Sequence, residues 1–422
     1  SDEDVEYLRS LNTFTEDFLQ YLQDFKFTGD VYAFPEGTIM YPNEPILTVV
    51  APLIDAQIVE TAILAQVNHQ SLVATKTARI VKAAEGKAVS DFGARRAHNM
   101  DAAVYGARAS YIGGAAGTAT VLAGQMFGIP VSGTMAHSWV MYYKDEYEAF
   151  KHYAENYPDN TVLLVDTYDT IKSGIPNAIR VAREVLEPMG KRLKGIRIDS
   201  GDLAYQSIKV RKMLDDAGLT DCKIIVSNSL DEHTISSLNM QKARIDGYGV
   251  GERLITGASS DYSEDSISLL GAVYKIAAVE ENGGFAPRIK VSGSVEKITN
   301  PGLKKVYRVY DQNGKAKADL IAKADETIDM SQEFRFVDPD MPWRNLKFTH
   351  CTVRPLQEKI FENGKLVYKL PTLNEIRAYV KKQLDEEIWE EEQRFVNPHK
   401  HYMDMTPDYY DMKMSLLNDS RA

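Results

Sequence analysis

The chain has 422 residues, of which 44% are hydrophobic and 26% are charged, an ordinary composition for a soluble globular protein. This length predicts a sizeable core and two or three domains, or a barrel with additions. The formal net charge of −11 argues against a general binder of nucleic-acid backbones, because such binding is largely cationic. Local arginines or lysines, or a metal ion, must therefore neutralise any polyanionic substrate.

Two cysteines, Cys222 and Cys351, cannot make a disulfide framework, and the first residues have no signal-peptide pattern. We therefore expect a cytoplasmic protein. The stretch between Arg108 and Lys144 has no Asp, Glu, Lys or Arg, but it is rich in Gly, Ser and Thr and contains a proline. A membrane span needs about 20 predominantly apolar residues in one run, so this stretch favours a buried helix followed by a buried strand.

The first predicted elements form an N-terminal helical and small β-sheet domain over residues 1–126. Apolar side chains recur at spacings of three and four within residues 1–25, which predicts helix. Turn signals separate short β-rich runs between residues 27 and 53. Further helices are expected at Asp55–Gln66, Ser71–Glu85, Asp101–Tyr111 and Ala119–Met126, with a loop at Asp91–Arg96.

Strand-like runs alternate with helices from residue 127 to residue 285. The runs are 128–133, 161–166, 195–199, 222–227, 246–250 and 272–278, separated by helices such as Asn177–Leu186 and Leu203–Ala217. Repeated βα units predict a parallel sheet, and six strands leave it short of a full barrel. The predicted fold is therefore α/β, with an irregular or incomplete (β/α) barrel as the catalytic domain.

Residues 286–422 are predicted to form a C-terminal β extension and a helical tail. Strands are expected at Lys290–Lys297 and Lys304–Asp311, the second followed by a hairpin turn at Asn313-Gly314. The acidic segment Thr372–Phe395 predicts a helix with a solvated face. The segment Tyr402–Asp419, rich in Tyr and Met, is expected to wrap the surface or a partner subunit.

Polar residues follow the strand-like runs, and His137, just past the first, is the strongest candidate for chemistry. The carboxyl ends of barrel strands share one face, where such barrels carry their active sites, so we expect an enzyme. A neutral imidazole at this position, beside Thr134 and Ser138, can act as a base or a nucleophile. Asp166 follows the next run and can either orient that imidazole or cap the following helix.

The segment Arg197–Asp202 is the densest group of polar residues. Alternation along a strand places Arg197 and Asp199 on the same side, where Arg197 can meet an anion. Asp199 and Asp202 can hold ribose hydroxyls or Mg²⁺, although a turn with an N-cap aspartate is an alternative.

Two late loops and one early loop suit an anionic ligand. Ser229 follows one late run, and Gly249 and Gly251 let the backbone approach a phosphate closely after another. Phe92, beside Arg95, offers an aromatic face and a cation for a flat anionic ring, unless the ring simply packs in the core.

Five motifs in chain order resemble those of the nicotinate phosphoribosyltransferase family. They are Asn68-His69-Gln70-Ser71-Leu72, Asp91-Phe92-Gly93-x-Arg95-Arg96, Gly133-Thr134-x-x-His137-Ser138, Arg197-x-Asp199-Ser200-Gly201-Asp202 and Gly249-x-Gly251-Glu252-Arg253-Leu254. The resemblance runs from about Phe34 to Asn397-Pro398-His399. A Thr-Asp-x-Tyr motif, whose tyrosine covers the base from the opposite subunit in this family, has no match before residue 30.

The resemblance implies a type II phosphoribosyltransferase fold and the reaction of nicotinate with phosphoribosyl pyrophosphate (PRPP), giving nicotinate mononucleotide and pyrophosphate. It implies coupling to ATP hydrolysis through phosphorylated His137, with Mg²⁺ and a homodimer whose active site lies at the subunit interface. The implied catalytic residues are His137, Asp166 and Asp199, and the implied metal ligands are Asp199 and Asp202. The implied substrate-binding residues are Phe92, Arg95, Thr134, Ser138, Arg197, Ser200, Asp202, Ser229, Gly249, Gly251 and Thr256.

The choice of base is informed by one position. The related nicotinamide enzyme carries Gly-Thr-Asp-Thr where this chain has Gly117-Thr118-Ala119-Thr120, and that aspartate contacts the amide. Ala119 imposes no repulsion on a carboxylate, which favours an acid substrate. The alternatives are an enzyme that uses nicotinamide or quinolinate, and a binding or regulatory protein that keeps affinity for PRPP or nucleotide without turnover.

Overall fold

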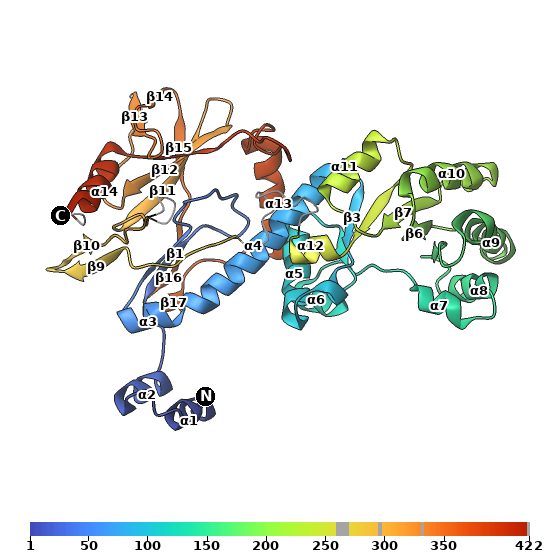
Figure 1. Ribbon diagram of the computed structural model, residues 1–422, viewed down its shortest axis with the longest axis horizontal. Helices are drawn as coiled ribbons and strands as arrows, with labels where there is room; N and C mark the ends of the chain where they lie inside the picture. Colours follow the sequence, from blue (N-terminus) through green and yellow to red (C-terminus); the bar gives the residue numbers. More distant parts are fainter. Residues whose placement is uncertain (259–269, 294–297, 331–332, 420–422) are drawn as a thin grey trace.

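The computed structural model describes residues 1–258, 270–293, 298–330 and 333–419. A parallel α/β sheet lies at one end of the molecule, and sheets whose pairings are mostly antiparallel lie at the other (Figure 1). The long helix α4 (Glu60–Ala83) runs between the two ends.

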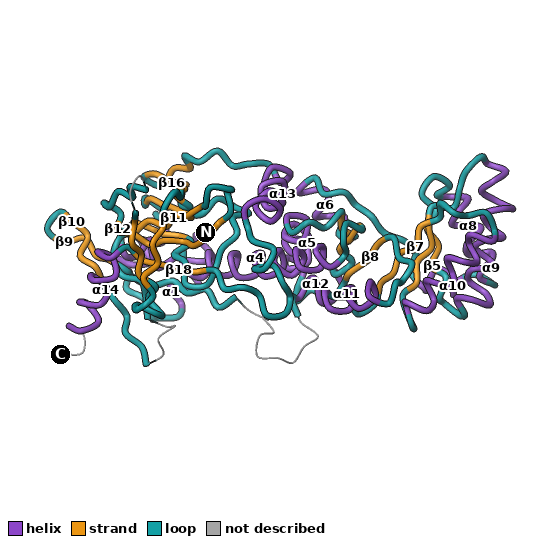
Figure 2. The backbone as a smooth tube through the Cα atoms, turned by 90° about the horizontal axis from the view of Figure 1, so that it is seen from above, coloured by secondary structure: helices purple, strands orange, loops and turns teal. Residues whose placement is uncertain are grey.

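The parallel sheet has six strands in the order β4-β3-β8-β7-β6-β5. Its strands are β3 (Ala88–Asp91), β4 (Gly117–Thr118), β5 (Val162–Leu164), β6 (Gly195–Ile198), β7 (Lys223–Ser227) and β8 (Gly247–Val250). The strands are rich in buried apolar side chains, as expected for a sheet covered on both faces. Figure 2 shows α8 (Glu146–Asn156), α9 (Ile175–Val181) and α10 (Leu203–Asp216) lying outside the strands at one end of this sheet.

The predicted fold class is confirmed, because this sheet is an incomplete barrel flanked by N- and C-terminal modules. Within the described residues, no strand pairing joins β4 to β5. The run 128–133, expected as a strand, contributes only a bridge from Val131 to Thr118, so that prediction was wrong. The run 272–278 was also wrong as a strand, because β9 (Ala278–Glu281) begins only at its last residue and pairs with β10 (Gly284–Pro287) in a separate hairpin.

Strands β3 and β4, which precede residue 126, were not predicted. Strands of four and two residues leave too short a pattern for alternation to reveal them. The parallel sheet therefore draws strands from both sides of the proposed boundary at residue 126, and the division of the chain into domains stays a prediction.

The N-terminal helices differ from the predicted ones mainly in where one helix ends and the next begins. Residues 1–25 form two helices, α1 (Asp2–Ser10) and α2 (Glu16–Gln23), separated at Asn12, whose φ is +53°. Next come α3 (Leu53–Ile58) and α4, which continues through the gap expected between residues 66 and 71. The predicted helices near residues 101 and 119 are confirmed as α5 (Met100–Ile112) and α6 (Val121–Phe127).

The predicted small N-terminal sheet exists, but both ends of the chain build it. Strands β1 (Asp30–Ala33) and β2 (Leu47–Val50) form a hairpin, and β1 also pairs with β16 (Glu358–Glu362), which pairs with β17 (Lys365–Leu366). Helix α13 (Leu373–Lys382) follows, and the predicted acidic helix ends near residue 387 rather than at Phe395.

The C-terminal region is built on a second six-stranded sheet, in the order β14-β13-β18-β12-β11-β15. Its strands are β11 (Lys304–Tyr310), β12 (Ala316–Lys323), β13 (Phe334–Val337), β14 (Asn345–Phe348), β15 (Thr352–Pro355) and β18 (Tyr402–Met405). The predicted strand from Lys304 and its turn are confirmed, with Gly314 at a φ of +77°. Residues 290–293 form no strand, and residues 294–297 lie outside the described residues. The tail packs on this sheet as β18 and α14 (Pro407–Asp419).

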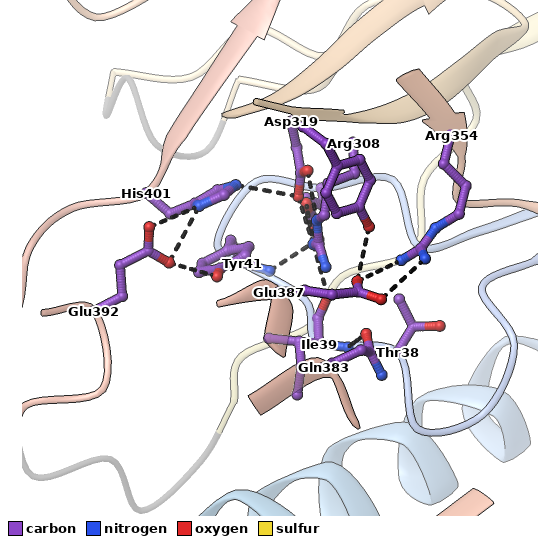
Figure 3. A network of polar contacts seen from close by, with 12 residues as sticks. Thr38, Ile39, Tyr41, Arg308, Asp319, Arg354, Gln383, Glu387, Glu392 and His401 are labelled. Atoms are coloured by element: carbon purple, nitrogen blue, oxygen red, sulfur yellow. Dashed lines mark hydrogen bonds and ion pairs between the residues drawn. The ribbon is translucent and has the colours of Figure 1, made fainter. Parts of the chain in front are cut away.

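A buried ionic network joins the loop before β2 to the C-terminal sheet (Figure 3). Arg308 on β11 is fully buried and donates to both carboxylate oxygens of Asp319 on β12, at 2.8 and 2.7 Å. His401 lies between Asp319 and Glu392, at 3.5 and 3.3 Å, and its ring stacks on Tyr41 at 3.7 Å between centroids. Burial alone would lower the pKa of His401, but the two carboxylates raise it above its ordinary value.

A second part of the network connects the C-terminal sheet to the segment after α13. Arg354 donates to Glu387, and Gln383 accepts from the Ile39 backbone N–H at 3.0 Å (Figure 3). The Tyr310 hydroxyl also donates to Glu387. These contacts fix residues 37–39 against both the C-terminal sheet and the helical segment.

Candidate active site

The candidate site lies at the carboxyl ends of the parallel strands, where the sequence predicted it. Arg197 is on β6, with Asp199 directly after it. Asp166 follows β5, Ser227 ends β7, and Gly251 follows β8. His137 is the first residue of α7 (His137–Tyr142) and approaches this edge from the loop after α6.

Arg197 is held by three different acceptors. Its Nε donates to Ser227 Oγ at 2.8 Å, one terminal nitrogen donates to Thr134 Oγ1 at 2.9 Å, and the other donates to Asp199 Oδ1 at 3.0 Å. Its guanidinium carbon lies 5.3 Å from the centroid of the Phe92 ring. The sequence placed Phe92, Thr134 and Asp199 in one site with Arg197, and the structure brings these three around the Arg197 cation.

The two oxygens of Asp199 have different surroundings. Oδ1 accepts from Arg197 and from the Ser227 hydroxyl. Oδ2 lies 3.7 Å from His137 Nε2, and the Asp199 side chain is 22% exposed. One oxygen is thus fixed by the protein, and the other faces the imidazole.

Asp166 positions Asp199 rather than His137. Its Oδ2 accepts from the Asp199 backbone N–H at 2.9 Å and from the Ser200 hydroxyl at 2.6 Å. The helix-capping alternative fails as well, because Asp169 caps the helical turn that follows. The expectation that Asp166 orients the imidazole is therefore corrected: the described contacts of His137 are with Asp199 and with Thr167.

Thr167 is a site residue that the sequence analysis missed. Its Oγ1 lies 3.0 Å from His137 Nδ1, so the two ring nitrogens face Thr167 and Asp199. His137 remains 40% exposed, and Ser138 beside it is exposed. A cavity of about 530 Å³ flanks this histidine, lined by Thr134, Met135, Ala136, Ser138, Trp139, Tyr142, Tyr153 and Tyr157.

Phe92 forms a wall of the site, and Gly249 makes room for it. A Cβ on Gly249 would lie 2.5 Å from two atoms of the Phe92 ring, so this glycine serves ring packing as well as backbone access. Arg95 follows Phe92 by three residues and lies in the short helical turn Ala94–Arg96. Its side chain is exposed.

A buried pair below Phe92 fixes the first two strands of the sheet. Asp91 is fully buried and accepts from the Thr118 hydroxyl at 2.7 Å and from the Gly93 N–H at 2.8 Å. Burial raises the pKa of Asp91 above its ordinary value. Ala119, at the same edge, follows β4 and is exposed.

The predicted phosphate loops have unusual backbone geometry. Asn228 and Ser229 have φ values of +91° and +49°, a conformation that costs energy for residues other than glycine and often marks a functional turn. Gly251 caps α12 (Glu252–Thr256), where the Thr256 hydroxyl donates to the Glu252 carbonyl. Asp231 begins α11 (Glu232–Met240) beyond this loop and pairs with Arg253 at 2.5 Å.

The carboxylates can serve a magnesium ion in the way that phosphate-handling enzymes commonly use it. Asp202 is exposed and caps α10 through Oδ1, as the alternative interpretation had it, while Asp199 Oδ2 faces the site. No group of three or more His, Cys, Asp and Glu side chains forms a metal cage in the described part of the chain. One or two carboxylates with substrate phosphates and water are a common Mg²⁺ environment, so the residues fit this ion.

Comparison with known proteins places the chain in a family. The model of the nicotinate phosphoribosyltransferase (NAPRTase) family matches residues 87–318, more than half of the chain. The chain belongs to the nicotinate phosphoribosyltransferase family. The models of this family's N-terminal and C-terminal domains match residues 1–68 and 303–413. The likeness therefore begins at residue 1, earlier than the motifs indicated, since they suggested a start at about Phe34.

Individual relatives agree with the family. A nicotinate phosphoribosyltransferase of Bacillus subtilis is 47% identical over all of this chain and 84% of its own length. The human nicotinate phosphoribosyltransferase is 32% identical over 82% of this chain and 72% of its own length. A crystal structure of human nicotinic acid phosphoribosyltransferase has a TM-score of 0.83 at 28% identity and covers 100% of this chain and 89% of that one. A nicotinate-nucleotide pyrophosphorylase from Pyrococcus furiosus has a TM-score of 0.65 at 30% identity, over 86% of this chain and 82% of its own.

A membrane span is not found. None of the helices among the described residues is long and apolar enough to cross a bilayer.

Proposed function

We propose that the chain transfers the phosphoribosyl group of PRPP to nicotinate, giving nicotinate mononucleotide and pyrophosphate for NAD salvage, in a reaction coupled to ATP hydrolysis. The observation that carries the proposal is the Arg197 guanidinium 5.3 Å from the Phe92 ring, at the active edge of the sheet. A flat ring with a carboxylate suits this pair, because the aromatic face can stack and the remaining N–H groups can bind the anion. Ala119 adds no carboxylate to repel it.

In the reaction, the pyridine nitrogen attacks C1′ of the ribose, and the bond from C1′ to the pyrophosphate oxygen breaks. Positive charge develops on the sugar while negative charge leaves with pyrophosphate. Asp199 Oδ2 is placed to stabilise the sugar or bind its hydroxyls, and the Ser229 and Gly251 loops suit the 5′-phosphate. Mg²⁺, held by Asp199 and Asp202, would neutralise the leaving pyrophosphate.

ATP enters the proposal through His137. Its two nitrogens face Thr167 and Asp199, and the ring is partly exposed beside a cavity, which supports a role as phosphoryl acceptor. The γ-phosphoryl group would pass from ATP to this ring and then to water. A phosphohistidine adds about two negative charges next to Asp199, and this charge would reorganise the PRPP site.

The assembly belongs to the proposal as well: a cytoplasmic homodimer with its active site at the subunit interface. Support comes from exposed apolar side chains beside the open edge of the sheet, on α6 and just after it. They are Val121, Leu122, Met126 and Val131. Exposed apolar side chains gathered within residues 121–131 suit a contact with a partner subunit.

The test is product formation from nicotinate and PRPP with Mg²⁺, with and without ATP, followed by chromatography. Nicotinate mononucleotide that increases with ATP supports the reaction and its coupling. The His137→Ala variant should lose ATP hydrolysis and ³²P incorporation from labelled ATP while keeping its fold. A labelled protein that persists in this variant would refute the role of His137.

Parallel assays separate the rivals. Faster turnover of nicotinamide would refute the acid preference. Quinolinate use would release carbon dioxide and need no ATP. Tight PRPP binding with no product from any base would favour a binding protein.

A further inference from the structure

Ser227 occupies a central position in the site, although no role was predicted for its side chain. It ends β7, and its side chain is 3% exposed. The pairing of Ile198 with Val226 places Asp199 beside Ser227 in the next register position. On its other side Ser227 pairs with Gly249, which has no side chain.

The Ser227 hydroxyl uses both of its hydrogen-bonding capacities inside the site. Its oxygen accepts from Arg197 Nε at 2.8 Å, and its proton goes to Asp199 Oδ1. The hydroxyl thus lies between a cation and a carboxylate that are two residues apart in the chain.

Without this hydroxyl, Arg197 and Asp199 could form a bidentate ion pair. Arginine and carboxylate groups favour a bidentate pair, with two parallel N–H···O bonds that use both oxygens. In the structure Arg197 gives Asp199 only one bond, to Oδ1, and Nε is occupied by Ser227. Oδ2 therefore stays available beside His137.

We propose that Ser227 is a positioning residue for the phosphoribosyl transfer: it prevents Arg197 from closing on both oxygens of Asp199. This keeps Oδ2 available for the sugar or its metal, and it keeps the guanidinium near the Phe92 ring. The inference rests on the proposed function for its kinetic consequence, but its structural consequence is independent of any activity.

The kinetic test compares Ser227→Ala and Ser227→Thr with the wild-type enzyme. We expect Ser227→Ala to lose kcat/KM for both PRPP and nicotinate by on the order of ten- to a hundredfold, the range typical when a group that orients a ligand-binding residue is removed. Ser227→Thr keeps the hydroxyl and should recover most of this loss. In an Asp199→Asn background, Ser227→Ala should cost much less, because the carboxylate it acts through is gone.

Ser110 provides the matched control. It is fully buried in α5 and donates to the Ala107 carbonyl, so Ser110→Ala removes an equally buried hydroxyl away from the site. Ser110→Ala should keep wild-type kinetics, and the Ser227 variants should unfold at a similar temperature to it. Wild-type kinetics in Ser227→Ala, or an equal loss in the Asp199→Asn background, would overturn the proposal.

A crystal structure of Ser227→Ala tests the same inference without turnover. We expect Arg197 to form a bidentate pair with Asp199 and to leave its place near Phe92. An unmoved Arg197 would refute the positioning role even if activity falls. If the wild-type protein forms no nicotinate mononucleotide, the proposed function fails, and this structural test still decides the role of Ser227.

Discussion

Gly249 and the Phe92 ring lie so close together that a side chain at position 249 would force the ring to move. An added Cβ would come within 2.5 Å of the ring, although the glycine itself has an ordinary strand conformation. The position of the proposed base-stacking ring therefore depends on the absence of one methyl group on a neighbouring strand.

Gly249→Ala should displace Phe92 and raise the KM for nicotinate by about fivefold, since aromatic stacking contributes about 1 kcal/mol beyond area burial. The measurement is steady-state kinetics with nicotinate varied at saturating PRPP. Gly247→Ala is the control on the same strand, because its Cβ would meet the Ala88 carbonyl at an ordinary 3.4 Å. Equal effects of the two changes would contradict this account.

Thr167→Val should slow phosphorylation of His137 by ATP about tenfold, because the imidazole loses the hydroxyl that holds Nδ1. The rate of ³²P incorporation from labelled ATP measures this. Thr167→Ser keeps the hydroxyl and should label near the wild-type rate. Unchanged labelling in the valine variant would show that Asp199 alone orients the ring.

Asp404→Asn should stabilise the protein increasingly as the pH rises from 5 to 8. Burial, reinforced by Asp338, raises the pKa of Asp404 to about 7, and neither carboxylate oxygen of Asp404 has a hydrogen-bond partner. The unfolded chain loses this proton near pH 4, so it binds fewer protons than the folded protein between about pH 4 and 7. The free energy of unfolding therefore falls across that window in the wild type.

The free energy of unfolding of the asparagine variant should not fall in this way. At pH 8 it should exceed that of the wild type by on the order of a few kcal/mol. Urea unfolding at several pH values measures it. Asp411→Asn, at an exposed position of α14, is the control and should show no such trend. A constant difference between Asp404→Asn and the wild type at all pH values would be inconsistent with the burial of a protonated carboxyl.

Arg308→Met should destabilise the protein by about 3–5 kcal/mol, because it leaves the buried Asp319 carboxylate without its main counter-charge. Chemical denaturation measures the change in the free energy of unfolding. Arg394→Met removes an exposed pair with Glu391 and should change it by no more than about 0.5 kcal/mol. Similar losses in both variants would argue against a special role for the buried network.

The sequence predicted the parts of the fold that have long or strongly periodic patterns. Strands β6, β7 and β8 and helices α5 and α10 lie close to their predicted ranges. The short strand β4 was missed, and the run 128–133 was wrong as a strand, because tertiary pairing rather than local pattern decides such short segments.

The site was predictable in its location and less so in its connections. Polar residues after successive strands indicated which edge carries the chemistry, and Arg197 and Asp199 do meet there. The roles of Ser227 and Thr167 depend on reach across neighbouring strands, which spacing along one chain does not reveal. For the same reason, Asp166 was matched to His137 when its bond is to the Asp199 backbone.

The pairing of β1 with β16 has a consequence for biosynthesis. Val31 lies opposite Phe361, so the first hairpin of the chain obtains its neighbour only after most of the protein has been translated. Until then β1 presents an open edge, which is a template for unwanted pairing with other nascent chains. Contacts this distant in sequence also slow folding. Chains that terminate before residue 358 should therefore aggregate rather than accumulate as a partly functional enzyme.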